Sequence, residues 1–190
     1  MVHKEESNIH DLELVKRAIA DPNEFEKVVE KYWGPLARFV RRISSSSNAD
    51  IEDVLQDSFV KAYLNLNSFD ESYKLSTWLY QIVRNSTIDA FRKNKSHFAI
   101  SQIEDKEIEE LFASSLDMEK DSDLKRDVTK LRVLIAQLST KYQEVMVLKF
   151  LEHKSYDEIM DIVKKPKGTV AALINRGRKI LKNRFEEENI

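Results

Sequence analysis

The chain has 190 residues, of which 34% are charged and 42% hydrophobic, with a net charge of −2, 3 glycines, 3 prolines and no cysteine. Without cysteine it forms no disulfide and offers no thiolate to a metal or a substrate, and its few glycines and prolines favour a mostly helical, all-α fold. No apolar run approaches the roughly 18 residues of a membrane span, and the polar N-terminus has no signal-peptide core. We therefore expect a cytoplasmic protein without membrane insertion.

Charge is strongly segregated along the chain. Residues 104–123 hold nine acidic residues and two lysines, whereas residues 164–184 hold eight basic residues and no acidic one. A nearly neutral protein with one basic end can bind a polyanion there without binding it everywhere.

Two helices are predicted at the N-terminus from apolar residues that recur every three or four positions. The first spans residues 11–20. Asp21-Pro22 then begins the second, with Glu24 completing a capping box and the apolar spacing continuing to Ile43.

Two more helices follow a serine-rich loop. The third covers about residues 50–66 and the fourth residues 76–95, with Ser76 or Thr77 as its N-cap. We expect these four helices to form one bundle over residues 1–97.

The helical pattern weakens over residues 98–127, which we interpret as an acidic flexible linker with at most a marginal helix at 106–112. It resumes over residues 131–138 and 139–150 within a second small domain, 128–190.

The second domain ends in a recognisable motif. Ser155 and Glu158 in SYDE form a capping box for a short helix, a KKPKG turn follows, and a long basic helix covers residues 169–185. Two helices joined by a tight turn, the second of them basic, are typical of a helix-turn-helix. The alternative is a basic helix that is merely exposed to solvent, but the capped helix and the tight turn before it favour DNA binding.

The predicted helix 76–95 carries an unusual polar face. An aromatic ring at Tyr80, an amide at Asn85 and a basic end suit unpaired bases, which stack on rings, offer their edges to amides and place phosphates near cations. The alternative is that the aromatic residues are core. For Trp78 we favour the core, because it lies in phase with apolar neighbours.

Nothing in the sequence points to an enzyme. The four histidines are scattered, and there is no glycine-rich phosphate loop, nucleophile motif or cluster of metal ligands. We expect no catalytic residue, metal, cofactor or small-molecule substrate.

Three segments together resemble a bacterial RNA polymerase sigma factor of the two-domain extracytoplasmic-function group. IEDVLQDSFVKAYLNL resembles one helix of that family's region 2, and STWLYQIVRNSTIDAFRK resembles the helix that follows it. KSYDEIMDIVKKPKGTVAALINRGRKILK resembles the helix-turn-helix of region 4. Both domains occur in the family's order, at its spacing and total length.

The resemblance implies roles for particular residues. Core RNA polymerase would be bound through its β′ and β subunits, and the coiled coil of β′ would face Asp53, Gln56 and Asp57. The unpaired −10 strand of promoter DNA would be held by Phe69, Tyr73, Tyr80, Arg84, Asn85 and Arg92. The −35 duplex would be read by Lys167, Thr169, Ala171, Asn175, Arg176, Arg178 and Lys179. The linker would thread the polymerase interior, and an anti-sigma factor would control the protein.

Five residues depart from the family pattern: Lys164 and Lys165 in the turn, Met160 before it, and Ala171 and Leu173 on the recognition face. They predict an unusual reading of the −35 element.

Two other functions fit parts of the sequence. A helix-turn-helix regulator of duplex DNA would not need the single-strand chemistry of residues 69–95. A sigma mimic that titrates an anti-sigma factor could lose the DNA-binding cations, which this chain keeps at Arg176, Arg178 and Lys179.

Overall fold

The computed structural model describes residues 2–44, 46–93 and 130–187. The described residues form helices and connecting loops without a strand, which confirms the all-α prediction. The predicted linker 98–127, with its marginal helix, lies outside the described residues.

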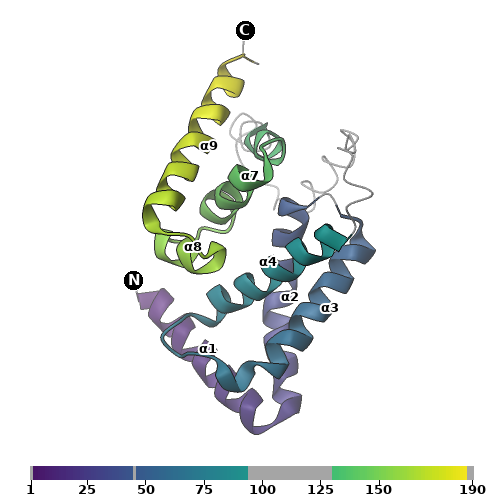
Figure 1. Ribbon diagram of the computed structural model, residues 1–190. Coiled ribbons are helices and arrows are strands. Elements are labelled where there is room, and N and C mark those ends of the chain that lie inside the picture. The colour runs from purple at the N-terminus through teal and green to yellow at the C-terminus, as the bar shows by residue number, and fades with distance from the viewer. Residues whose placement is uncertain (1, 45, 94–129, 188–190) are drawn as a thin grey trace, which may run out of the picture.

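Four helices form the N-terminal half (Figure 1): α1 (Val2–Ala20), α2 (Phe25–Ile43), α3 (Asn48–Leu64) and α4 (Leu75–Lys93). One face of α2 packs into the core of this half, because its apolar residues recur at helical spacing. The buried residues of that face are Phe25, Val28, Tyr32, Leu36, Phe39 and Val40. Each such side chain contributes about 1.5–3 kcal/mol when fully buried.

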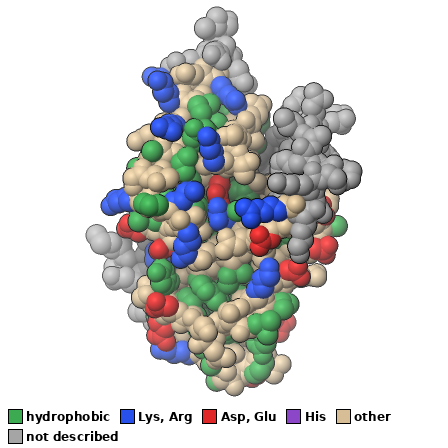
Figure 2. All heavy atoms as spheres, viewed as in Figure 1, with side chains coloured by type: hydrophobic (Ala, Val, Ile, Leu, Met, Phe, Trp, Pro, Cys, Tyr) green, Lys and Arg blue, Asp and Glu red, His purple; other side chains and the backbone are tan. Residues whose placement is uncertain are grey.

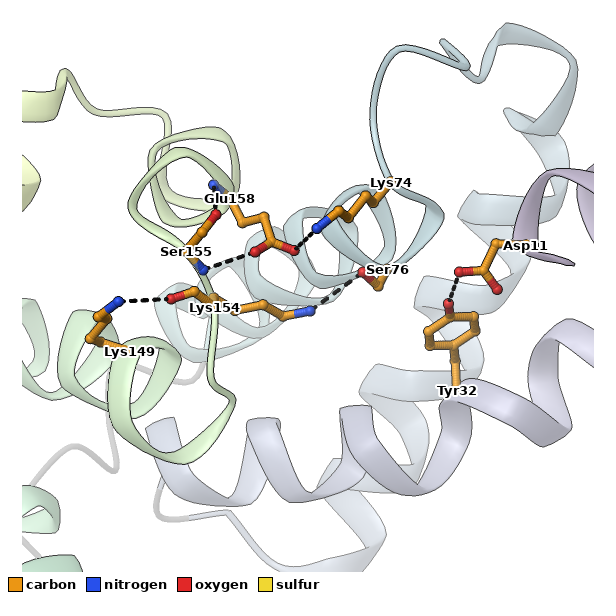
Figure 3. Close-up of polar contacts among 8 residues, drawn as sticks. All are labelled: Asp11, Tyr32, Lys74, Ser76, Lys149, Lys154, Ser155 and Glu158. Atoms are coloured by element: carbon orange, nitrogen blue, oxygen red, sulfur yellow. Dashed lines mark hydrogen bonds and ion pairs between the residues drawn. The ribbon is translucent and has the colours of Figure 1, made fainter. Parts of the chain in front are cut away.

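A buried polar contact fixes α1 against α2. Asp11 on α1 is only 4% exposed, and its carboxylate accepts a hydrogen bond from the Tyr32 hydroxyl at 2.6 Å (Figure 3). It also accepts one from the Lys31 ammonium at 2.7 Å. The pair of donors offsets the cost of removing this carboxylate from water.

Two predicted helix starts are wrong in detail. Asp21 does not form a capping box with Glu24. Its carboxylate accepts from the Asn23 N–H at 3.0 Å and caps a single 3₁₀ turn, η1 (Pro22–Glu24), while Glu24 pairs instead with Lys27. The 3₁₀ geometry brings the second N–H, rather than the third, to the capping oxygen.

The fourth helix begins earlier than predicted. Leu75 is completely buried and starts α4, so Ser76 and Thr77 lie inside its first turn and neither is its N-cap. The Lys74 carbonyl accepts from the Trp78 N–H at 3.1 Å, so the first helical turn closes from Lys74 and includes the buried Leu75. The cap of α3 does follow the rules, since Ser47 and Asp50 form a capping box.

The C-terminal half is a second helical unit. A helical segment at 130–136 leads to α7 (Thr140–Met146), which continues into a π-helical segment, η3 (Val147–Leu151). The helix-turn-helix then consists of α8 (Tyr156–Val163) and α9 (Lys167–Glu187).

The motif is built as its sequence predicts. The Glu158 N–H donates to the Ser155 hydroxyl at 3.2 Å, and the Ser155 N–H donates to the Glu158 carboxylate at 2.8 Å, which confirms the capping box. Lys164 ends α8 in the left-handed region, at φ 52°. Glycine reaches this conformation at lower cost than lysine does, so the lysine adds strain to the turn.

The two halves pack directly against each other. Helix α8 lies along α4, and α7 and η3 contact α2 (Figure 1). This contact covers part of the predicted nucleic-acid site.

Candidate nucleic-acid interface

One face of α4 meets the C-terminal half. Ser76, Tyr80 and Arg84 follow one another at spacings of four, which places them on the same side of the helix. The sequence analysis assigned Tyr80 and Arg84 to an unpaired DNA strand. In this structure both contact residues of the helix-turn-helix half instead.

Tyr80 lies at the centre of this contact and is only 4% exposed. Its ring lies 5.0 Å from the ring of Phe39, between centroids, and the Lys154 ammonium lies 4.1 Å from its centroid. Its hydroxyl donates to Glu152 at 2.6 Å. Burial raises the pKa of Tyr80, and the negative charge and hydrogen bond of Glu152 raise it further, so the hydroxyl stays protonated.

Arg84 forms an ion pair with Glu144 of α7. Its Nε donates to one carboxylate oxygen, and its second terminal nitrogen donates to the other at 3.2 Å. The side chains are 15% and 11% exposed. Such forked geometry is the way a guanidinium also binds phosphate. The other terminal nitrogen donates to the Asn85 amide oxygen at 3.2 Å.

Glu152 also takes a cation from α2. Arg42 donates to its second carboxylate oxygen at 2.6 Å, and the two side chains are 13% and 8% exposed. The backbone carbonyl of Arg42 accepts from the Gln143 side chain at 2.8 Å. The carboxylate of Glu152 thus joins α2 and α4 to the end of η3.

Three contacts continue the interface to the start of α4, and Figure 3 shows the first two of them. Lys74 pairs with Glu158 at 3.1 Å, and the Lys154 ammonium donates to the Ser76 hydroxyl at 3.4 Å. The Lys164 ammonium lies 5.6 Å from the centroid of the Tyr73 ring.

Glu158 is held in its charged form. Burial alone would raise its pKa, but the hydrogen bonds from Ser155 and the pairing with Lys74 outweigh burial and lower the pKa to about 2.

The remaining residues predicted for the −10 strand lie at the edge of this contact or outside it. Asn85 and Arg92 are exposed on α4, and Tyr73 is 39% exposed. Phe69 is half-buried and packs on Trp78 at 5.3 Å between ring centroids. Trp78 packs against the core, as its phase predicted.

The residues predicted to bind polymerase share the exposed face of α3. Asp53, Gln56 and Asp57 are all exposed. The same face continues with Val60 and Leu64, which are 58% and 71% exposed. The sequence analysis did not single out these two residues, although both fall out of phase with the buried residues of α3.

Helix α9 presents most of its predicted DNA-reading residues to solvent, and Lys and Arg side chains gather over it (Figure 2). The exposed members are Lys167, Thr169, Asn175, Arg176, Arg178 and Lys179. Ala171 and Leu173 are half-buried. The guanidinium of Arg178 lies 5.1 Å from the Phe150 ring centroid. The opposite face packs inward through Val170 and Ile174.

Other kinds of site find no support in the residues that the structure describes. They contain no group of three or more His, Asp or Glu residues placed to hold a metal ion. No helix among them is both long enough and apolar enough to cross a membrane.

The sequence and structure match known proteins over both halves. Residues 28–97 match Sigma-70 region 2, and residues 129–181 match Sigma-70 region 4. The ECF RNA polymerase sigma factor SigW of Bacillus subtilis is 31% identical, over 88% of this chain and 91% of SigW. SigM of the same organism is 28% identical, over 83% of this chain and 92% of SigM.

Two solved structures share the fold at 22% identity. CnrH in complex with the cytosolic domain of CnrY has a TM-score of 0.65 and covers 93% of this chain and 97% of its own. RpoE in complex with the anti-sigma factor NepR from Bartonella quintana has a TM-score of 0.62 and covers 86% and 97%. Together with the match to SigW, the two matched regions show that this chain belongs to the ECF RNA polymerase sigma factors, which are transcription initiation factors.

Proposed function

We propose that this sigma factor divides promoter recognition between its two halves and docks on core RNA polymerase through α3. The observation that carries this assignment is the order of chemically distinct surfaces along the chain. An exposed acidic face on α3 is followed by rings, an amide and cations around α4 and then by an exposed basic helix, α9.

The α3 face is suited to protein docking. Asp53, Gln56 and Asp57 offer charge and hydrogen bonds, and Val60 and Leu64 add apolar area beside them. We assign this face to the coiled coil of the polymerase β′ subunit. Exposed apolar side chains that lie together beside polar ones mark candidate protein-interaction surfaces.

The −10 strand is assigned to the loop before α4 and to α4 itself. Tyr73, Tyr80 and Phe69 supply rings, Asn85 supplies an amide, and Arg84 and Arg92 supply cations. Since Tyr80 and Arg84 face the C-terminal half in this structure, their use on DNA requires that the halves separate.

The −35 element is assigned to the exposed side of α9. Thr169, Asn175, Arg176 and Lys179 are exposed, which supports their assignment to the major groove and its flanking phosphates. Lys167 and Arg178 are exposed as well and are assigned to the same surface. Ala171 and Leu173 are half-buried and so offer less surface to the bases than their exposed neighbours do.

The assignments extend to domains and regulation. We assign residues 1–97 to region 2 and 128–190 to region 4, with the acidic residues 98–127 as a linker through the polymerase. The two structural neighbours are complexes with CnrY and the anti-sigma factor NepR, and we propose a similar controlling partner here, acting in the cytoplasm on a protein without catalytic activity. The match to region 2 disfavours the alternative of a simple helix-turn-helix regulator.

Footprinting of the reconstituted holoenzyme tests these assignments. The expected result is a duplex protected around −35 and thymines around −10 that react with permanganate, both dependent on this chain. Protection of a duplex by the chain alone, with no polymerase-dependent opening, would instead support a duplex-binding regulator.

A further inference from the structure

Three glutamates of the C-terminal half cover the face of α4 assigned to single-stranded DNA. Glu144 comes from α7, Glu152 follows η3, and Glu158 lies in α8. Each takes a donor of the N-terminal half: the first pairs with Arg84, the second accepts from Tyr80 and Arg42, and the third pairs with Lys74. The contact therefore occupies the part of this face from Lys74 to Arg84.

These contacts have the chemistry of a bound strand. The carboxylate of Glu144 takes the forked pair of Arg84 donors that a phosphate would take. The ammonium of Lys154 lies over the Tyr80 ring, where an unpaired base would stack. One segment, residues 144–158, supplies both the anionic groups and the cover of the ring.

We propose that this segment is an internal substitute for the −10 strand, so that the free protein rests in a closed form whose α4 face cannot hold single-stranded DNA. The inference rests on the proposed role of α4 in DNA binding. Opening of the closed form exposes Tyr80 and Arg84 together, because the same segment covers both. Asn85 and Arg92 stay exposed in the closed form and remain available for a first contact.

Ion pairs of this kind suit a switch. The Arg84–Glu144 and Arg42–Glu152 pairs are largely removed from water, so the attraction between partners is offset by the hydration that both recover on opening. The pairs therefore fix how the halves meet while adding little to the stability of the closed form. Loss of one partner alone removes the attraction but keeps the cost of burying the other charge, and so favours the open form.

Energy transfer between dyes can follow the opening in the full chain, because the sequence has no cysteine of its own. Glu30→Cys on α2 and Asn183→Cys on α9 replace exposed residues, one in each half. We expect a single high-transfer population for the parent chain. Salt should affect it mainly through the more exposed pair of Lys74 and Glu158, because the other two pairs are shielded from solvent.

The decisive variant combines E144Q, E152Q and E158Q. Its ratio of open to closed molecules should rise at least about tenfold, because three cations lose their partners. The matched control combines E13Q, E26Q and E52Q, which neutralise exposed glutamates of the N-terminal half, and should leave transfer unchanged. Exchange of the two charges distinguishes opening from misfolding. Glu144→Arg or Arg84→Glu alone should open the chain, and the two together should restore the pair and the closed form.

Binding of fluorescent (dT)20 tests the link to DNA. The triple variant should bind it about tenfold more tightly than the control, which has the same net charge and so the same general attraction to a polyanion. Unchanged transfer in the triple variant and both single charge reversals would overturn the closed form. Opening of the chain without tighter binding of (dT)20 would overturn the claim that residues 144–158 occupy the place of the −10 strand. Neither result depends on transcription, so failure of the proposed sigma activity would be seen separately.

Discussion

The hydroxyl of Tyr80 on α4 donates a 2.6 Å hydrogen bond to Glu152, which lies 72 residues further along the chain. A ring that the sequence places among the DNA-binding residues is thus held between Phe39 of one half and Lys154 of the other. The proposed binding of single-stranded DNA by α4 and the observed contact between the halves would therefore use the same residues.

The first prediction concerns polymerase docking. Asp53→Lys with Asp57→Lys should weaken binding of the chain to core polymerase, because it reverses two charges one turn apart on the exposed face of α3. The measurement is affinity for core at moderate salt, with helix content followed by circular dichroism. Glu26→Lys with Glu30→Lys has the same spacing on the exposed side of α2 and is the control. Equal affinities for the two double variants would contradict the assignment of α3.

A second prediction concerns the unpaired strand. Asn85→Ala removes an exposed amide, so the fold and its melting temperature should not change. Loss of its contacts with a base should weaken holoenzyme binding to a pre-melted −10 bubble by about 1–3 kcal/mol, or about 5- to 150-fold. The control is Asn183→Ala, which removes an exposed amide from α9. Both variants are measured on a template that lacks the upstream −35 duplex, so that α9 has no duplex to bind. Full affinity of Asn85→Ala for the bubble would exclude capture of a base by this residue.

Packing of the helix-turn-helix gives a third prediction. A β-carbon added at Gly177 would lie 2.9 Å from the sulfur of the buried Met146 side chain. A β-carbon added at Gly168 would have no such neighbour within 4 Å. Gly177→Ala should therefore lower the free energy of unfolding by about 1–2 kcal/mol, the cost of overpacking less the gain in helix propensity. Gly168→Ala should change it by at most about 1 kcal/mol, in the stabilising direction. Denaturant titration measures the free energy of unfolding of both variants. A Gly177→Ala variant more stable than Gly168→Ala would contradict the close approach of Met146 to Gly177.

The fourth prediction concerns acid. The pKa of Glu158 falls from its ordinary value of 4.5 to about 2 in the folded chain, so its charged form stabilises the fold above pH 4.5. This contribution should decrease as the pH falls from 4.5 towards 2. Glu158→Gln cannot titrate, so it should be less stable than the parent at pH 6 and approach it near pH 2–3. A difference in the free energy of unfolding that stays constant over this range would show that the contacts of Glu158 do not lower its pKa.

Local signals in the sequence predicted much of the fold. The capping box of Ser155 and Glu158, the following turn and the basic helix α9 all form as expected, because each depends on residues within a few positions. The exposed face of α3 was also predictable from the phase of its apolar residues. Errors occurred where burial or local geometry outweighed a polar signal, as at Leu75 and at the 3₁₀ turn after Asp21.

The contact between the halves could not be predicted in this way. Arg84 and Glu144 are 60 residues apart, and no periodic pattern connects them. Nothing in the sequence around Glu144 and Glu152 distinguishes them from surface acids. The packing of α7 and η3 on the N-terminal half brings them to Arg84 and Arg42. Residues assigned from the family pattern, such as Tyr80, therefore gain a second set of partners that the pattern does not contain.

Run-off transcription with purified core polymerase on fragments of genomic DNA tests the central claim most directly. If the chain is a sigma factor that opens promoters, defined transcripts should appear only when both the chain and core polymerase are present. The variant with Asp53→Lys and Asp57→Lys should reduce them, whereas the variant with Glu26→Lys and Glu30→Lys should not. Transcripts no more abundant than with core polymerase alone, across fragments that cover the genome, would contradict the account.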